Sequence, residues 1–343
     1  MSEWALHDPD PEQESWRILA DSGQPYYGGD PHGHGINTNR GAAIRTVCHC
    51  AFKRNPPQFE RVFILLEQIS ENDPSTAVRS CIIDVLGPLL NQDTKRTLEI
   101  FENAVGDHPV LLRSPLAHRF LSWVYREHFD RAQPFIVTLL AHSDDSTRQA
   151  GARLACLAAF FHSGAEELAK QALNGDEIMR QGAAQVYSRN LENEEFSDFC
   201  QGHLLKLMHD PDEEVRKHVG ECFMYLRDEH LSELRQFIEA FLNSPALLLG
   251  AEHLIEYLNP LAIEEHELAL HVTERILDIG GDEIIDMRRP LAIIERDLVK
   301  LPLTVYTHTL DTKQQEYAMT LFEQLLVKGS HSAVQALSDW DRR

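Results

Sequence analysis

Histidine and glutamate side chains are the first candidates for chemistry, because together they bind metal ions and transfer protons. The chain has 18 histidines, and the order His-Glu occurs only at His266-Glu267. The reversed order recurs, with separations of 102, 23 and 13 residues, at Glu127-His128, Glu229-His230, Glu252-His253 and Glu265-His266. These separations follow no regular period. We therefore expect solvated or hydrogen-bonded histidines and no shared metal site.

Two shorter motifs also combine metal-binding residue types. His32-Gly33-His34 follows Asp30 in a glycine-rich stretch, and Cys48-His49-Cys50 lies in a stretch with helical periodicity. Neither motif supplies four ligands at the spacing of a zinc site, and residues two apart on a helix point to different faces. Gly28-Gly29 precedes no Gly-Lys-Ser/Thr, which a phosphate-binding loop needs. We predict no catalytic residue, no metal and no cofactor.

Charge is the most informative bulk property of the 343-residue chain. It has 32 basic and 54 acidic residues, a formal net charge of −22, and 43% of its residues are hydrophobic. An acidic surface repels phosphate backbones, so nucleic acid is not an expected partner. A basic or amphipathic protein is the partner that this charge favours. The sequence leaves the oligomeric state open.

The sequence also bears on the cellular compartment. No stretch approaches the roughly 20 apolar residues that span a bilayer. The first residues, Met1-Ser2-Glu3-Trp4, lack the basic-then-apolar order of a secretory signal. Most of the six cysteines lie within helical stripes and are expected to be reduced core residues. We predict a cytoplasmic protein without a membrane partner.

The most ordered pattern of the chain is the run Asp210-Pro211-Asp212-Glu213-Glu214-Val215-Arg216. It predicts a helix start, with Asp210 as the N-cap and Pro211 at the first helical position. Glu213, three residues after the cap, suits a capping box. A buried stripe of the helix follows at Val215, Val219, Cys222 and Leu226.

This pattern recurs along the chain. Similar runs extend from Asp73 to Arg79 and from Asp282 to Arg288, the latter with the stripe Met287, Leu291, Ile294 and Leu298. Weaker copies begin at Asp107, Asp144 and Asp176, and still weaker ones lie at residues 37–40 and 244–250, where Gly250 replaces the arginine. The arginines 79, 113, 148, 180 and 216 are 34, 35, 32 and 36 residues apart. A period in this range, with two helices per unit, predicts an α-solenoid.

The repeated aspartates and arginines have two interpretations. As structure, each arginine bridges to the turn aspartate of the neighbouring repeat; as function, the row of arginines binds an acidic ligand. A bidentate carboxylate is the natural partner of arginine, which favours the structural interpretation. The expected ladder consists of Asp73, Arg79, Asp107, Arg113, Asp144, Arg148, Asp176, Arg180, Asp210, Arg216, Asp282 and Arg288.

The expected domain organisation is an N-terminal cap, residues 1–36, followed by one continuous repeat domain, residues 37–343. The cap should hold a short helix from Asp10 to Ala20 and a loop from Gly23 to Gly35. Function is expected where the repeat is broken. The candidate partner-binding residues are Tyr26, Tyr27, His32, His34, Glu264, Glu265 and Glu267.

The Asp-Pro-x-x-x-Val-Arg turn at this period resembles HEAT repeats, including the HEAT-like units named after phycobilisome lyases. The resemblance covers roughly residues 37–330. It implies an all-α fold, a right-handed α-solenoid of about eight helix-turn-helix repeats. It says little about function, because such scaffolds serve many proteins.

A narrower resemblance concerns two stretches. Residues 23–30 and 35–43 are similar to the region that opens the C-terminal helical arm of large bacterial NTPases, some of the STAND (anti-phage sensor) type. Residues 175–187 are similar to a later part of that arm. The resemblance implies a recognition arm, either one that acts alone or part of a longer NTPase.

We expect a non-enzymatic protein-binding scaffold. One alternative is an enzyme on a HEAT scaffold, a metal-dependent hydroxylase such as deoxyhypusine hydroxylase or a lyase, which needs a clustered His/Glu or Cys site. The other is a DNA-binding HEAT protein similar to the alkylpurine glycosylases. That function requires a basic concave groove, which the charge of −22 disfavours.

Overall fold

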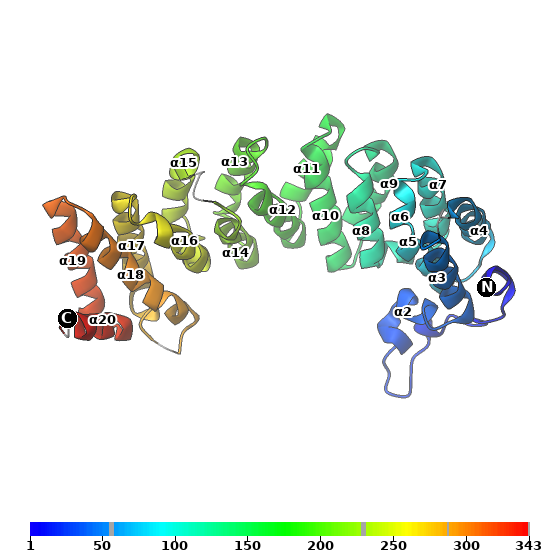
Figure 1. Ribbon diagram of the computed structural model, residues 1–343, viewed down its shortest axis with the longest axis horizontal. Coiled ribbons are helices and arrows are strands. Elements are labelled where there is room, and N and C mark those ends of the chain that lie inside the picture. The colour runs from blue at the N-terminus through cyan, green and yellow to red at the C-terminus, as the bar shows by residue number, and fades with distance from the viewer. Residues whose placement is uncertain (55–57, 228–230, 287, 342–343) are drawn as a thin grey trace. The chain divides into compact units, whose positions relative to one another are not determined.

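The fold is all-helical, as predicted (Figure 1). The computed structural model describes residues 1–54, 58–227, 231–286 and 288–341. In these ranges it contains the α-helices α1 to α20, short 3-10 turns and no β-strand, with an isolated bridge between Leu19 and Pro25. None of the helices in the described part of the chain is both long and apolar enough to cross a membrane.

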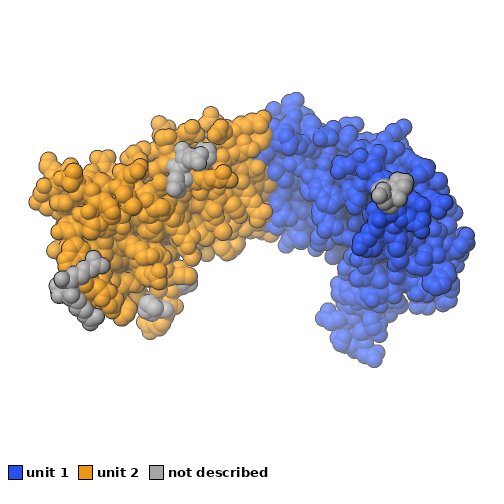
Figure 2. Space-filling model, viewed as in Figure 1, with its two compact units in different colours: residues 1–170 blue, residues 171–343 orange. Residues whose placement is uncertain are grey.

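The chain divides into two compact units, Met1–Lys170 and Gln171–Arg343 (Figure 2). Unit 1 carries 16 basic and 22 acidic residues, a net charge of −6, whereas unit 2 carries 16 basic and 32 acidic residues, a net charge of −16. Most of the negative charge of the protein therefore belongs to unit 2.

Unit 1 is built from two rows of helices. Helices α3, α5, α8 and α10 pack one on the next, while α4 packs on α7 in the other row. The rings of Phe101 and Phe120 stack between the rows with centroids 4.4 Å apart, and both are buried. The helices are α1 (Ser2–His7), α2 (Pro31–Gly35), α3 (Asn39–Phe52), α4 (Phe59–Asn72), α5 (Thr76–Val85), α6 (Gly87–Leu90), α7 (Thr94–Val105), α8 (Pro115–Val124), α9 (Phe129–Leu140) and α10 (Asp145–Ala159), and α11 (Glu166–Leu173) follows at the boundary.

Unit 2 repeats this arrangement. Helices α12, α14, α16 and α18 pack in sequence, and the second row contains the pairs α13–α15 and α17–α19. The helices are α12 (Glu177–Asn190), α13 (Ser197–Leu207), α14 (Glu213–Gly220), α15 (Leu231–Leu242), α16 (Leu247–Leu261), α17 (His266–Gly280), α18 (Glu295–His308), α19 (Thr312–Val327) and α20 (His331–Asp341).

Gly250, which replaces the repeat arginine, lies at a close helix crossing. A Cβ atom added to Gly250 of α16 would lie 2.5 Å from the Cα of Gly220 in α14, and the reverse distance is also 2.5 Å. No side chain fits there. The irregular residue in the repeat is thus explained by the backbone approach of two neighbouring helices.

The helix that follows Asp210 begins two residues later than predicted. Its N-cap is Asp212, whose carboxylate accepts the N–H of Val215 at 3.0 Å. Asp210 instead accepts the N–H of Asp212, at 2.9 Å. The turn at Asp73 has the same form, with Ser75 as the N-cap of α5. Pro211 therefore precedes the cap and does not occupy the first helical position.

Other copies of the pattern agree with the structure to different degrees. Asp144 and Asp176 are N-caps, of α10 and α12. The helix start predicted at Asp107 is wrong, because Ser114 caps α8 after a 3-10 turn. The start predicted at Asp282 is also wrong, because a 3-10 turn, Gly281–Glu283, lies there and the next α-helix is α18. Met287, assigned to its stripe, lies outside the described residues.

The N-terminal segment also differs from its prediction. The expected helix from Asp10 to Ala20 is wrong: only Ser15–Arg17 forms a 3-10 turn, because Asp10 accepts the N–H of Asn39 at 2.7 Å and so contacts the start of α3. Part of the expected loop is helical, since Asp30 caps α2 through two backbone N–H groups. His32 and His34 therefore lie on a helical turn.

Candidate protein-binding groove

The repeat arginines first bind the turn that opens their own helix. Arg79 Nε donates to the Asp73 carbonyl at 2.6 Å, and Arg216 Nη1 donates to the Asp210 carbonyl at the same distance. The corresponding bonds of α10 and α12 are Arg148 Nη1 to the His142 carbonyl, at 2.9 Å, and Arg180 Nη1 to the Gly175 carbonyl, at 2.6 Å. The recurring arginine thus satisfies a turn carbonyl five or six residues before it.

Some arginines also bridge to the turn of the following repeat. Arg180 binds both carboxylate oxygens of Asp210, at 2.7 and 3.1 Å. Two further bridges are Arg40–Asp73, at 3.3 Å, and Arg113–Asp144, at 3.8 Å. Hydrogen bonding to Asp210 raises the pKa of Arg180, which favours its charged form. These ion pairs link each of the three arginines to the turn of the next repeat.

The ladder is not continuous through every predicted member. Arg79 donates to the Asn103 carbonyl, at 2.5 Å, and not to a carboxylate of the next turn. Arg288 is exposed and binds Asp286 two residues earlier, at 2.9 Å, so the predicted ladder position at Arg288 is wrong. Arg288 therefore forms a local ion pair in place of a bridge to another repeat.

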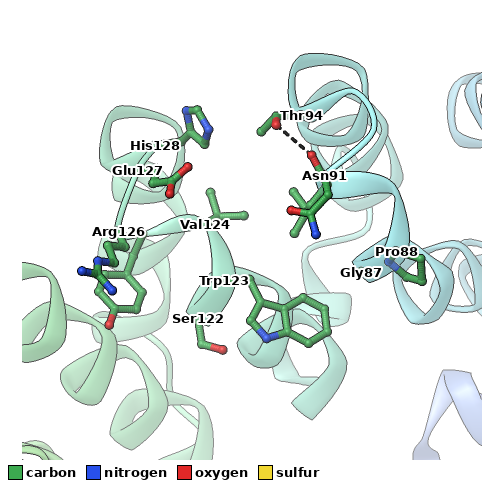
Figure 3. Close-up of a pocket in the computed structure, with 12 residues that line it drawn as sticks. Gly87, Pro88, Asn91, Thr94, Ser122, Trp123, Val124, Arg126, Glu127 and His128 are labelled. Carbon is green, nitrogen blue, oxygen red and sulfur yellow. Dashed lines mark hydrogen bonds between the residues drawn. The ribbon is translucent and has the colours of Figure 1, made fainter.

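A groove in unit 1 is the main candidate for binding a partner. It has a volume of about 700 Å³ and lies between α6 with the start of α7 on one side and the end of α8 with its following turn on the other. Figure 3 shows Asn91 and Thr94 facing Trp123, Val124 and His128 across this space. We call it the Trp123 groove.

Trp123 is the principal apolar surface of the groove. It is 50% exposed although it lies on α8 among buried neighbours. A Cβ atom added to Gly87 would lie 2.7 Å from the indole ring, so Gly87 provides the space that the ring occupies. The guanidinium of Arg119 lies 5.6 Å from the ring centroid, within the range of a cation–π contact. The indole is therefore held in place while about half of the side chain stays exposed.

An ionic cluster borders the Trp123 groove. Asp84 of α5 lies 3.2 Å from Arg45 of α3 and 3.5 Å from Arg119 of α8, so two arginines share one carboxylate. Arg45 and Asp84 also line a second pocket, of about 440 Å³, which shares Pro88 with the groove. Arg45 and Arg119 each remain about half exposed.

His32 connects the N-terminal segment to this cluster. Burial lowers the pKa of His32, and the charge of Asp84 opposes that effect more than any other group. The imidazole is therefore favoured in its neutral form. His32 lies on α2, which packs on α5, the helix that carries Asp84.

The other N-terminal candidates have different environments. Tyr26 and Tyr27 are exposed, as a contact surface requires. His34 is buried and stacks against Tyr27, with ring centroids 5.1 Å apart. The side chain of His34 thus supports Tyr27 and also lines a pocket of about 340 Å³ with Pro9 and Asp10, so its role in binding a partner stays a prediction.

The acidic candidates lie in unit 2, at the turn into α17. Glu264 and Glu267 are exposed, and Glu265 pairs with Arg235 at 3.3 Å. Glu267 also borders a pocket of about 500 Å³ between α17 and α19. In that pocket, burial and a hydrogen bond to Glu274 raise the pKa of Tyr317. The acidic stretch thus lies at a turn between helices and exposes the carboxylates of Glu264 and Glu267.

The described residues contain no group of three or more His, Cys, Asp or Glu side chains that could hold a metal ion. Five of the six cysteines are buried, and Cys50 is the exposed one. Burial raises the pKa of Cys48 and of Cys81 to about 12, which keeps these thiols protonated and unreactive at neutral pH.

Trp123 was not among the candidate binding residues named from the sequence. A helix turns 100° per residue, so Phe120, Leu121 and Val124 share one face and Trp123 lies off it. The phase of the tryptophan relative to that stripe was the signal of its exposure. The matching Gly87 on another helix carries no such signal.

Comparisons with known proteins add no relative: the chain matches no model of a protein family, no curated protein and no solved structure. The groove and the turns are therefore interpreted from their own geometry.

Proposed function

We propose that the protein is a non-enzymatic protein-binding scaffold, built as a right-handed α-solenoid of about eight HEAT-like repeats. Three features support this architecture: the period of the arginines, the two rows of helices within each unit, and the bridges from Arg40, Arg113 and Arg180 to the next turn. In this design the repeated charges hold neighbouring repeats in register, which leaves the exposed helix surfaces for binding.

The observation that carries the binding function is the half-exposed Trp123 in an open groove beside Arg119. Tryptophan and arginine are enriched among the residues that dominate interface energies. A large aromatic side chain that is held rigidly by Gly87 loses little conformational freedom when a partner covers it.

Unit 2 suggests a second contact of opposite character. Its net charge of −16 and the exposed carboxylates of Glu264 and Glu267 favour a basic or amphipathic partner surface. We further propose that the scaffold acts as a recognition arm of a bacterial NTPase system, which rests on the resemblance of residues 23–43 and 175–187 to such arms.

The test is affinity purification from the source cell at moderate salt, with the full chain as bait. We expect a specific protein to be recovered by the wild type and by the Ile64→Ala control, which removes an exposed apolar side chain of α4, and to be reduced by Trp123→Ala. Recovery that is equal for all three baits would reject the groove. Near-stoichiometric iron or zinc in the purified protein would favour an enzyme instead.

A further inference from the structure

The charges around the Trp123 groove are more evenly balanced than those of the whole chain. The residues that line the groove and its neighbouring pocket, with Arg119, include three arginines, Arg45, Arg119 and Arg126, and two carboxylates, Asp84 and Glu127. This near balance of charge occurs in a protein of net charge −22. An acidic segment is thus repelled less by this surface than by most of the rest, and the arginines provide local attraction.

The arginines at the edge of the groove are arranged to accept another carboxylate. Arg45 and Arg119 share Asp84, and a guanidinium has five N–H donors, so both retain donors after binding that one carboxylate. Both side chains are about half exposed, so part of each is accessible to a partner. A carboxylate that docks here completes two arginine–carboxylate pairs without first breaking the existing ones.

The distance from arginine to tryptophan sets the spacing that the partner needs. The Arg119 guanidinium lies 5.6 Å from the centroid of Trp123. In an extended peptide, side chains two positions apart point the same way and are about 6–7 Å apart. An acidic residue at one position can therefore meet Arg119 while an apolar residue two positions away covers the indole.

We propose that the Trp123 groove binds an extended protein segment with an aspartate or glutamate two positions from an aromatic or large aliphatic residue. This inference rests on the proposed protein-binding function and specifies the partner of that site. Single-stranded nucleic acid also combines negative charge with stacking rings. It fits less well, because Asp84 and Glu127 border the groove and repel a continuous phosphate backbone.

The experiment selects random short peptides displayed on phage against the full chain, then measures the binding of synthesised, fluorescently labelled winners. We expect winners enriched in the acidic-x-apolar pattern. Arg119→Glu and Trp123→Ala should each weaken binding at least about tenfold. Two exposed residues of α4 provide matched controls, Arg61→Glu for the charge and Ile64→Ala for the apolar side chain, and these should change binding less than about twofold.

The inference would be overturned if no peptide were enriched, or if the selected peptides were rich in lysine and arginine. It would also be overturned if Arg119→Glu and Trp123→Ala left the affinity of the selected peptides unchanged. A fourth contrary result is an oligothymidine probe that binds the wild type as tightly as the selected peptides and loses binding in both variants. If the selected peptides bound both variants with wild-type affinity, this groove would be rejected as their binding site. The proposed scaffold function would remain, since the chain would still bind peptides. Thermal unfolding followed by circular dichroism checks that each variant is folded. Gly87→Ala, which crowds the indole without removing it, provides a second variant and should also weaken binding.

Discussion

The turn at Asp210 and the segment from Asp282 to Arg288 have similar sequences and different structures. At Asp210, a partly buried aspartate receives Arg180 from the preceding repeat and Arg216 from its own helix. In the other segment Arg288 turns back onto Asp286 in an exposed loop. At Asp210 an arginine of the preceding repeat reaches a turn aspartate and forms a joint between repeats, whereas Arg288 forms only a local ion pair.

The largest expected effect comes from breaking the Asp210 joint. Asp210→Ala removes the bidentate partner of Arg180 and the acceptor of the Asp212 N–H. We expect a loss of about 2–3 kcal/mol in the free energy of unfolding, because the arginine remains partly buried and loses its counterion. Equilibrium urea unfolding followed by circular dichroism measures it.

Arg288→Ala is the matched control for that change. Its ion pair is fully solvated, so the urea midpoint should not move measurably. Equal shifts for the two variants would contradict the distinction between a joint and a local ion pair.

The next largest effect concerns the glycine crossing. Gly250→Ala places a methyl group against Gly220, and overpacking of this kind costs about 1–3 kcal/mol. Gly202→Ala in α13 meets no atom within 4 Å and should leave stability unchanged or raise it by up to about 1 kcal/mol, because alanine favours the helix. Differential scanning calorimetry of both variants provides the comparison. A neutral Gly250→Ala would show that the helices are not in close contact there.

The smallest expected effect is a pH dependence in unit 1. Burial lowers the pKa of His108, with help from the charge of Arg79, and the ring bonds the Thr76 hydroxyl at 2.7 Å. The folded state therefore binds fewer protons than the unfolded state just below the ordinary histidine pKa of about 6.5. The contribution of neutral His108 to the free energy of unfolding is therefore fully present above that pH and declines as the pH falls.

His108→Gln should accordingly reduce the difference in urea midpoint between neutral and mildly acidic buffer. His49→Gln, at an exposed position, should leave that difference as in the wild type. If His108→Gln showed the same difference in urea midpoint as the wild type, the pH dependence would come from other groups.

Much of the scaffold was predictable because it depends on local and periodic features. Helix capping depends on residues close in sequence, and the arginine period can be read directly from the sequence. For this reason α10 and α12 begin after Asp144 and Asp176 as expected. The shift of the cap from Asp210 to Asp212 was not predictable in the same way. Two carboxylates compete there for one helix start, and Arg180 from another repeat decides between them.

The groove was less predictable, because it depends on contacts between distant segments. Gly87 and Trp123 are far apart in sequence, and neither shows by itself that one makes room for the other. Likewise, the pairing of Asp84 with Arg45 and Arg119 arises from the packing of α3, α5 and α8. The helices could be predicted from the periodicity of the sequence. The surface that they form together could not, because it depends on how they pack in the tertiary structure.

Hydrogen exchange of the full chain, with and without a saturating peptide selected as above, tests the central claim most directly. The claim is that the joints build the scaffold and the Trp123 groove binds. Bound peptide should slow exchange in residues 84–94 and 119–128 and leave the turn at residues 208–216 unchanged. Protection confined to the joints, or protection that persists in the Trp123→Ala variant, would contradict it.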